Sequence, residues 1–167
     1  TGAASEAEIA VVKLKEAKDY LRKFYGIRQK AVCYQETDIV QGLRYLHLLA
    51  LKKQMPLVMC VALGTNLGGH NGMSSLSRIL GSYSRLVDRC VVIGGGNEAN
   101  ERHHFQGKLN QVGEVQEVEM RVESGNTGFV AELWGTIPNI VTAYLISPSG
   151  ERSPVISIRS LSAYISL

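Results

Sequence analysis

The feature that most constrains the fold of this chain is the stretch Arg89–Asn100, whose sequence is RCVVIGGGNEAN. A short apolar run rich in β-branched residues breaks into three glycines and ends at Asn97, which carries an amide side chain. This pattern predicts a buried parallel strand that runs into a tight turn without side chains. In open α/β sheets, ligand-binding and catalytic groups lie just outside the carboxyl ends of such strands. Asn97 is therefore the first candidate functional residue.

Two interpretations of Asn97 stay open from this stretch alone. In the first, Gly and Asn form an ordinary turn, because both residue types tolerate the backbone angles that turns need. In the second, the glycines leave room for the backbone of a bound molecule, and the amide donates a hydrogen bond to negative charge that develops on an oxygen during a reaction.

The composition excludes several classes of protein. With 167 residues, 45% of them hydrophobic, the chain can form one core and a second, smaller one. The net charge is +3, and Lys and Arg are interspersed with Asp and Glu, so we expect no nucleic-acid partner. No window approaches about 18 consecutive apolar residues, so we expect no membrane span. The amino terminus also lacks the basic region and apolar core of a signal peptide.

The three cysteines are odd in number and widely spaced, and two of them, Cys60 and Cys90, lie inside apolar runs. This pattern predicts buried core thiols and argues against a disulfide framework or a thiolate metal site. We expect no nucleophilic role for Cys33 and no cofactor.

The first hundred residues alternate between two patterns. Helical periods occur at Lys15–Phe24, Asp38–Lys53, where Asp38 is a candidate N-cap, and Ser74–Val87. Short apolar runs, which predict buried parallel strands, occur at Ile9–Leu14, Leu57–Leu63 and Cys90–Ile93. This order predicts an α/β fold with a parallel sheet that is covered on both faces.

After Gly113 the hydrophobic period falls to two. The alternating runs are Val115–Val122, Phe129–Trp134, Ile140–Ile146 and Val155–Ile158, with turn sequences GNTG, TIPN and SPSG between them. We therefore expect an antiparallel β-sandwich or jelly-roll-like segment with one solvated face. The chain also lacks an initial methionine, and it opens and closes within a pattern. From this we expect a piece of a longer protein.

Four stretches, in this order, resemble the middle of the subtilases, the subtilisin-like serine endopeptidases: EIAVVKLK, QETDIVQGLRYL, LVMCVALGTNLGGHNGMSSL and CVVIGGGNEANERHH. The sequence is most similar to the clostridial spore-germination type, in which a jelly-roll segment follows the oxyanion asparagine. The resemblance implies a partial subtilase catalytic domain at residues 1–110 and a β-sandwich or jelly-roll-like insertion at 111–167. It also implies a secreted or spore-associated setting.

The resemblance assigns roles to residues beside the strand ends. Asn97 matches the asparagine that supplies half of the oxyanion hole. Leu63 and Gly64 match a segment that binds an extended substrate backbone and forms one wall of the first specificity pocket. Gly94, Gly95 and Gly96 match the opposite wall. Glu98 is either close to the floor of that pocket or a solvated residue after a turn, and Tyr34–Thr37 matches the other substrate-flanking strand less securely.

The catalytic residues of the family are absent from this chain. Subtilases present an Asp in a D-[ST]-G segment, a His in an H-G-x-x-V segment and a Ser in a G-T-S segment, and none of these occurs here. By the resemblance, the first two precede Thr1 and the third follows the jelly roll.

Other motifs are interpreted as structural. Ser74 and Ser75 follow His70 closely, but Ser74 is better explained as an N-cap with Ser77 three residues on, so we expect no local nucleophile and base. His103 and His104 are neighbours that would point to opposite faces of a strand, so we expect no metal site. The glycine runs lack the spacing and the lysine of a phosphate-binding loop.

The sequence thus predicts a segment of a subtilisin-like endopeptidase that is inactive alone, with a polypeptide substrate and the rest of the longer protein as partners. The main alternative is a segment of a non-catalytic, subtilase-like sensor or binding protein. A third possibility is that residues after Gly113 form an independent adhesive or carbohydrate-binding sandwich.

Overall fold

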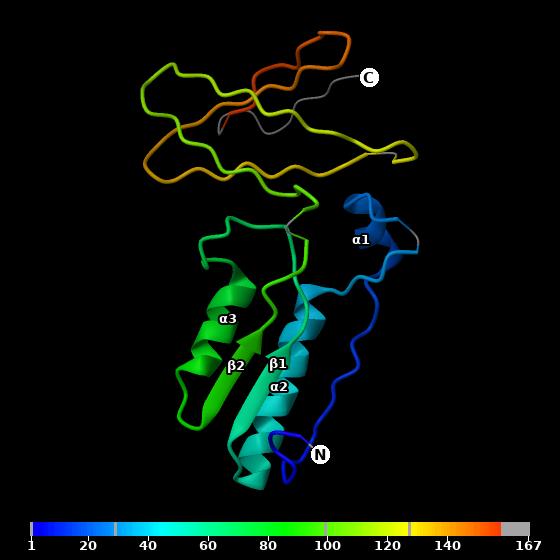
Figure 1. Ribbon diagram of the computed structural model, residues 1–167, viewed down its shortest axis with the longest axis vertical. Coiled ribbons are helices and arrows are strands. Elements are labelled where there is room, and N and C mark those ends of the chain that lie inside the picture. The colour runs from blue at the N-terminus through cyan, green and yellow to red at the C-terminus, as the bar shows by residue number, and fades with distance from the viewer. Residues whose placement is uncertain (1, 29, 99, 127, 158–167) are drawn as a thin grey trace. The chain divides into compact units, whose positions relative to one another are not determined.

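A computed structural model describes residues 2–28, 30–98, 100–126 and 128–157 (Figure 1). The chain divides into two compact units, Thr1–Ala131 and Glu132–Leu167, and each is described by itself. This division is geometric, and the functional boundary at 110/111 stays a prediction.

The first unit contains all of the helices and strands among the described residues. In chain order they are α1 (Asp19–Phe24), α2 (Glu36–Lys53), β1 (Leu57–Val61), α3 (Ser75–Ser84) and β2 (Arg89–Ile93). The two strands pair in parallel, with Leu57 opposite Arg89 and Val61 opposite Ile93. The sheet, with helices beside it, agrees with the α/β prediction, and helix α3 forms the crossover that a parallel pair requires.

The core of this unit lies on one face of the sheet. Met59 and Val61 of β1, Leu43 of α2 and Leu80 of α3 form a buried cluster, and Met59 is 1% exposed. Because alternate residues of a strand point to opposite faces, Met59 and Val61 direct their side chains to the same side. Both long helices therefore cover the same face.

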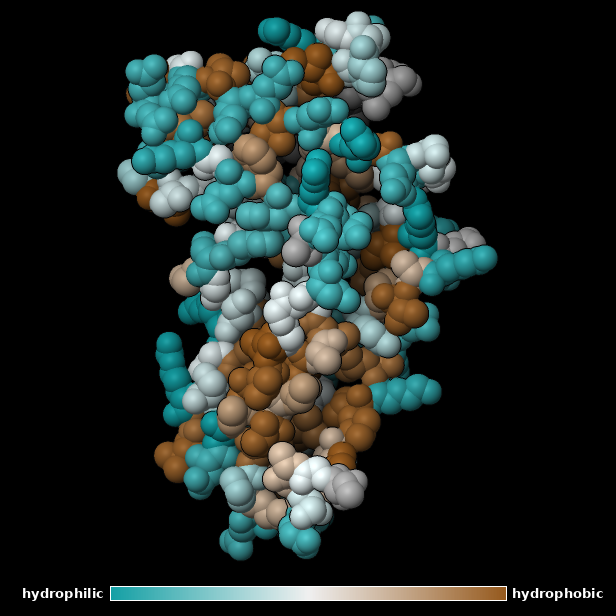
Figure 2. All heavy atoms as spheres, in the orientation of Figure 1, coloured by the Kyte–Doolittle hydropathy of each residue, from teal (hydrophilic) through white to brown (hydrophobic). Residues whose placement is uncertain are grey.

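The other face of the sheet is open. Val58 is 67% exposed and Val92 is 49% exposed, and Cys60 and Cys90 are exposed as well. Figure 2 shows apolar side chains gathered where Figure 1 draws β1 and β2. The prediction of a sheet covered on both faces is wrong for the described residues, and so is the prediction that Cys60 and Cys90 are buried. Their alternation places them on the side without a helix.

The expected strand at Ile9–Leu14 does not form. Ile9 and Val11 are more than 80% exposed. Val12 instead packs on α2 at Gly42, where a Cβ would lie 3.0 Å from Val12 Cγ1. The apolar alternation of this segment is therefore satisfied by contact with a helix and not by a strand ladder.

The helices differ from the predictions at their ends. Helix α2 begins at Glu36 after Gln35, so Asp38 lies in its first turn and is not the N-cap. Helix α1 begins only at Asp19, because the residues before it are extended and Ala17 N–H donates to Cys33 O at 2.9 Å. Helix α3 ends at Ser84, three residues before the expected end at Val87.

The expected strands 115–122 and 129–134 do not appear among the described residues. The second unit does contain a short hairpin. Ala143 and Ile156 exchange both backbone hydrogen bonds, at 2.9 and 2.7 Å, and Ile146 pairs with Arg152 around the predicted SPSG turn. Ile158 lies outside the described residues. The jelly roll stays a prediction, because isolated bridges do not make its two sheets.

None of the helices in the described ranges has the length and apolar character needed to cross a bilayer.

Candidate functional site

Two loops meet beyond the carboxyl ends of the parallel strands. One follows β1 and runs from Ala62 to Ser74, and the other follows β2 and runs from Gly94 to His104 (Figure 1). Gly94 N–H donates to Val61 O at 3.1 Å, which extends the pairing one residue past the strands. Ligands of parallel α/β sheets bind at this edge.

Asn97 lies at a bend in the second loop, and its side chain is exposed. Within the described part of the chain, its amide takes part in none of the hydrogen bonds of this loop. An exposed, uncommitted amide is what a donor to an incoming oxygen requires, although the same geometry also suits a simple turn.

The glycines around Asn97 leave open space. A Cβ added at Gly64, Gly95 or Gly96 would meet no atom within 4 Å. At Gly94 the nearest atom to such a Cβ would be Ala62 Cα, at 3.9 Å. Gly96 also has φ +82°, an angle that side-chain-bearing residues adopt only at a cost.

Leu63 is predicted to line the cleft, but its side chain is directed toward the core. It is half-buried, and its side chain packs against the core cluster of Leu43, Met59, Val61 and Leu80. Any contribution to a cleft would therefore come from its backbone, which is the part that an extended peptide would bind.

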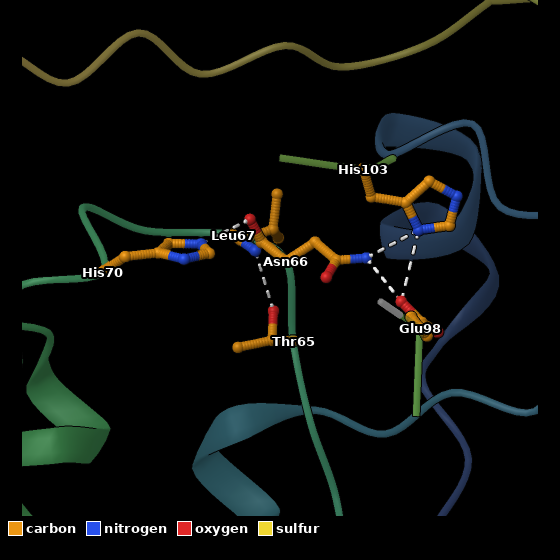
Figure 3. Close-up of polar contacts among 6 residues, drawn as sticks. All are labelled: Thr65, Asn66, Leu67, His70, Glu98 and His103. Carbon is orange, nitrogen blue, oxygen red and sulfur yellow. Dashed lines mark hydrogen bonds and ion pairs between the residues drawn. The ribbon is translucent and has the colours of Figure 1, made fainter. Parts of the chain in front are cut away.

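Glu98 is held by two side chains (Figure 3). Asn66 Nδ2 donates to Glu98 Oε2 at 2.9 Å, and His103 Nδ1 lies 3.2 Å from the same oxygen. Asn66 Nδ2 also lies 3.1 Å from His103 Nδ1. The hydrogen bond from Asn66, followed by the contact with His103, holds the pKa of the Glu98 carboxyl below its ordinary value. We call Asn66, Glu98 and His103 the loop clasp, since they connect the two loops.

The other two histidines of these loops, His70 and His104, contact each other. The rings of His70 and His104 stack with centroids 4.6 Å apart and an interplanar angle of 12°, and His70 Nε2 lies 3.2 Å from Asn66 O. His103 and His104 thus have separate partners. The described residues contain no group of three His, Cys, Asp or Glu side chains suited to a metal ion.

Ser74 is the N-cap of α3, as the sequence predicts. Its Oγ accepts a hydrogen bond from Ser77 N–H at 3.2 Å and donates to Ser77 Oγ at 2.8 Å. The predicted substrate-flanking segment Tyr34–Thr37 is a strand only at one residue: Tyr34 forms an isolated antiparallel bridge with Glu16, and α2 begins at Glu36.

No motif in the sequence predicts the loop clasp. Asn66 lies 32 residues from Glu98 and 37 from His103, a separation without any motif spacing. An open hollow of about 320 Å³ also lies in the first loop, between Thr65 and Ser77, and it does not include the predicted cleft residues.

No family model matches this chain, and no curated protein matches it. Among solved structures, its fold is similar to that of the Clostridium perfringens CspB protease, with a TM-score of 0.57 and 23% sequence identity. The match covers 78% of this chain and 28% of the CspB chain, so the present chain spans less than a third of that protein. At this identity the likeness concerns the fold alone.

Proposed function

We propose that this chain is a segment of a subtilisin-like serine endopeptidase, in which Asn97 donates to the oxyanion and Leu63–Gly64 and Gly94–Gly96 line the substrate cleft. The observation that carries the proposal is the exposed amide of Asn97 beside the open space at Gly95 and Gly96. The fold likeness to the CspB protease supports it.

The chemistry follows from the charge that forms during peptide hydrolysis. Attack on the scissile carbonyl carbon produces a tetrahedral adduct with negative charge on the former carbonyl oxygen. A neutral amide that is already in place stabilises this charge without transferring a proton. A carboxylate at the same position would repel it. The nucleophile, the base and the orienting acid belong, in this proposal, to other parts of a longer protein.

Those other parts would also explain the open face of the sheet. A two-stranded parallel pair has two unpaired edges, and parallel sheets are normally buried on both faces. The exposed Val58 and Val92 therefore suit contact with further elements of the same protein. A polypeptide substrate would bind at the strand ends, away from this face.

The first test uses the chain alone. Purified chain incubated with a peptide ester is expected to show no turnover above buffer, because it lacks the family's nucleophile and base. Hydrolysis that is abolished by an active-site serine reagent would show that the nucleophile lies within these residues, and this part of the proposal would be wrong.

The second test uses the longer protein that contains this segment. Asn97→Ala is expected to lower kcat by roughly 10²- to 10³-fold with KM nearly unchanged, a magnitude measured for the same donor in subtilisin itself. Asn97→Asp is expected to lower kcat further, because a carboxylate would repel the negative charge on the oxyanion. Asn100→Ala, in the same loop, is the matched control. Full activity in Asn97→Ala would refute the role of the amide, and a longer protein with no peptidase activity would favour the non-catalytic alternative.

A further inference from the structure

The loop clasp is the point at which the two loops of the candidate cleft are joined by side chains (Figure 3). Asn66 comes from the loop after β1, and Glu98 and His103 come from the loop after β2. Glu98 directly follows Asn97 in the sequence. Any change in how Glu98 is held therefore acts on the backbone that positions the Asn97 amide.

The three contacts of the clasp cannot all be hydrogen bonds at the same time. His103 Nδ1 lies 3.2 Å from Glu98 Oε2 and 3.1 Å from Asn66 Nδ2. With a proton on Nδ1, the ring donates to the carboxylate, but the amide hydrogens of Asn66 cannot donate to it. With a lone pair on Nδ1, the ring accepts from Asn66 but faces the carboxylate oxygen unfavourably. The charged ring carries a proton on both nitrogens and can only donate from Nδ1, whereas the neutral ring can also present a lone pair there and accept from Asn66, so protonation of the ring favours the contact with Glu98.

We propose that His103 is a pH-sensitive positioning residue, whose protonated ring holds Glu98 and so fixes the loop that presents Asn97 at the cleft. The pH response of the clasp stands on geometry alone, while its effect on substrate rests on the proposed function. Histidine is the residue suited to such a role, because its ordinary titration falls between about pH 5 and pH 8.

The surroundings of the ring are simple. Among the described residues, Glu98 is the charged group in contact with it and Asn66 is the polar one. Glu101 and Arg102 precede it on its own loop. The other two histidines of the site, His70 and His104, stack on each other. The side chains of His103 and Glu98 are 50% and 54% exposed, so protons exchange freely with solvent.

The experiment follows the ¹⁵N-labelled chain by NMR from about pH 8 to pH 5, a range that covers histidine titration. The ring signals of His103 and the side-chain amide signals of Asn66 and Asn97 are recorded together. We expect both amides to shift with the same midpoint as the His103 ring. In Glu98→Gln, we expect the His103 ring signals still to change with pH. The Asn97 amide signal is expected no longer to follow them.

His104→Gln is the matched control, because it removes the stacked pair and leaves the clasp in place. The coupling between His103 and Asn97 is expected to persist in it. The proposal is overturned if the Asn97 amide does not follow the His103 ring, or if it follows the ring equally well in Glu98→Gln. Signals of the α2 and α3 amides, which must stay unchanged, report that each variant is folded. Since no activity is measured, this result is separate from the Asn97→Ala test of the proposed function.

Discussion

Asn97 and Glu98 are consecutive in the sequence, but their side chains differ in their hydrogen-bond partners. Among the described residues, the exposed amide of Asn97 takes part in none of the side-chain hydrogen bonds of its loop, whereas the carboxylate of Glu98 contacts Asn66 and His103. Their roles therefore separate: one residue is available to a ligand, and the other fixes the loop. Gly96, with φ +82°, allows the chain to turn into this arrangement.

The lowered pKa of Glu98 predicts a pH dependence of stability. A carboxyl whose pKa is lower in the folded than in the unfolded chain stabilises the fold above the unfolded pKa, about 4.3 for glutamate. This contribution is lost as the pH falls through the lower, folded pKa. We expect the free energy of unfolding to fall less on acidification in Glu98→Gln than in the unchanged chain.

Urea titrations at a series of pH values measure this difference. Glu101→Gln removes a carboxylate from the same loop and controls for the change in net charge. Identical pH profiles for Glu98→Gln and the unchanged chain would mean that the clasp does not stabilise the ionised carboxylate.

At the scale of the elements, α3 shows how a sequence signal becomes local structure. Ser74 has extended backbone angles and satisfies the Ser77 N–H, which would otherwise lack an intrahelical partner. Leu80 then belongs to the core cluster, and Leu76 and Tyr83 pack against it. The sequence of α3 thus determines both where the helix begins and which of its sides is buried.

Replacing this cap tests the assignment. Ser74→Ala is expected to lower the free energy of unfolding by about 1 kcal/mol, because the first turn loses its acceptor. Ser74→Gly is expected to cost only a few tenths of a kcal/mol. Ser82→Ala, where the hydroxyl donates to Ile79 O inside the helix, is the control and is expected to be neutral or slightly stabilising. A urea midpoint for Ser74→Ala equal to that of Ser82→Ala would contradict the capping role.

At the scale of the whole molecule, the open face of the sheet is the main departure from a self-contained domain. In the unit Thr1–Ala131, one face of the sheet is buried under two helices and the other presents Val58, Cys60, Cys90 and Val92. Exposed apolar surface of this kind marks an interaction site or a tendency to self-associate.

The cysteines allow this face to be probed. In the native chain at low concentration, we expect Cys60 and Cys90 to react rapidly with a disulfide reagent such as DTNB. Cys33 is expected to react more slowly, because it is half-buried and its Sγ accepts a hydrogen bond from Arg22 at 2.9 Å. Cys60→Ser, Cys90→Ser and Cys33→Ser identify each phase. Protection of Cys60 and Cys90 that increases with protein concentration would indicate a second copy on this face, and protection independent of concentration would show that the face is covered within one chain.

Much of the local structure followed from the sequence. Strands β1 and β2, helices α2 and α3 and the cap at Ser74 were predictable, because apolar period, capping residues and glycine breaks act within a few residues along the chain. The position of Asn97 just beyond β2 followed for the same reason.

The tertiary structure alone decided which face of the sheet is buried, that Val12 packs on α2, and that Asn66 meets Glu98 and His103. An alternating or apolar run is compatible with burial against either a strand or a helix, so its pattern cannot choose the partner. The contacts that Asn66 makes in the clasp join residues more than thirty positions apart, and such contacts exist only once the two parallel strands have brought their carboxyl ends together.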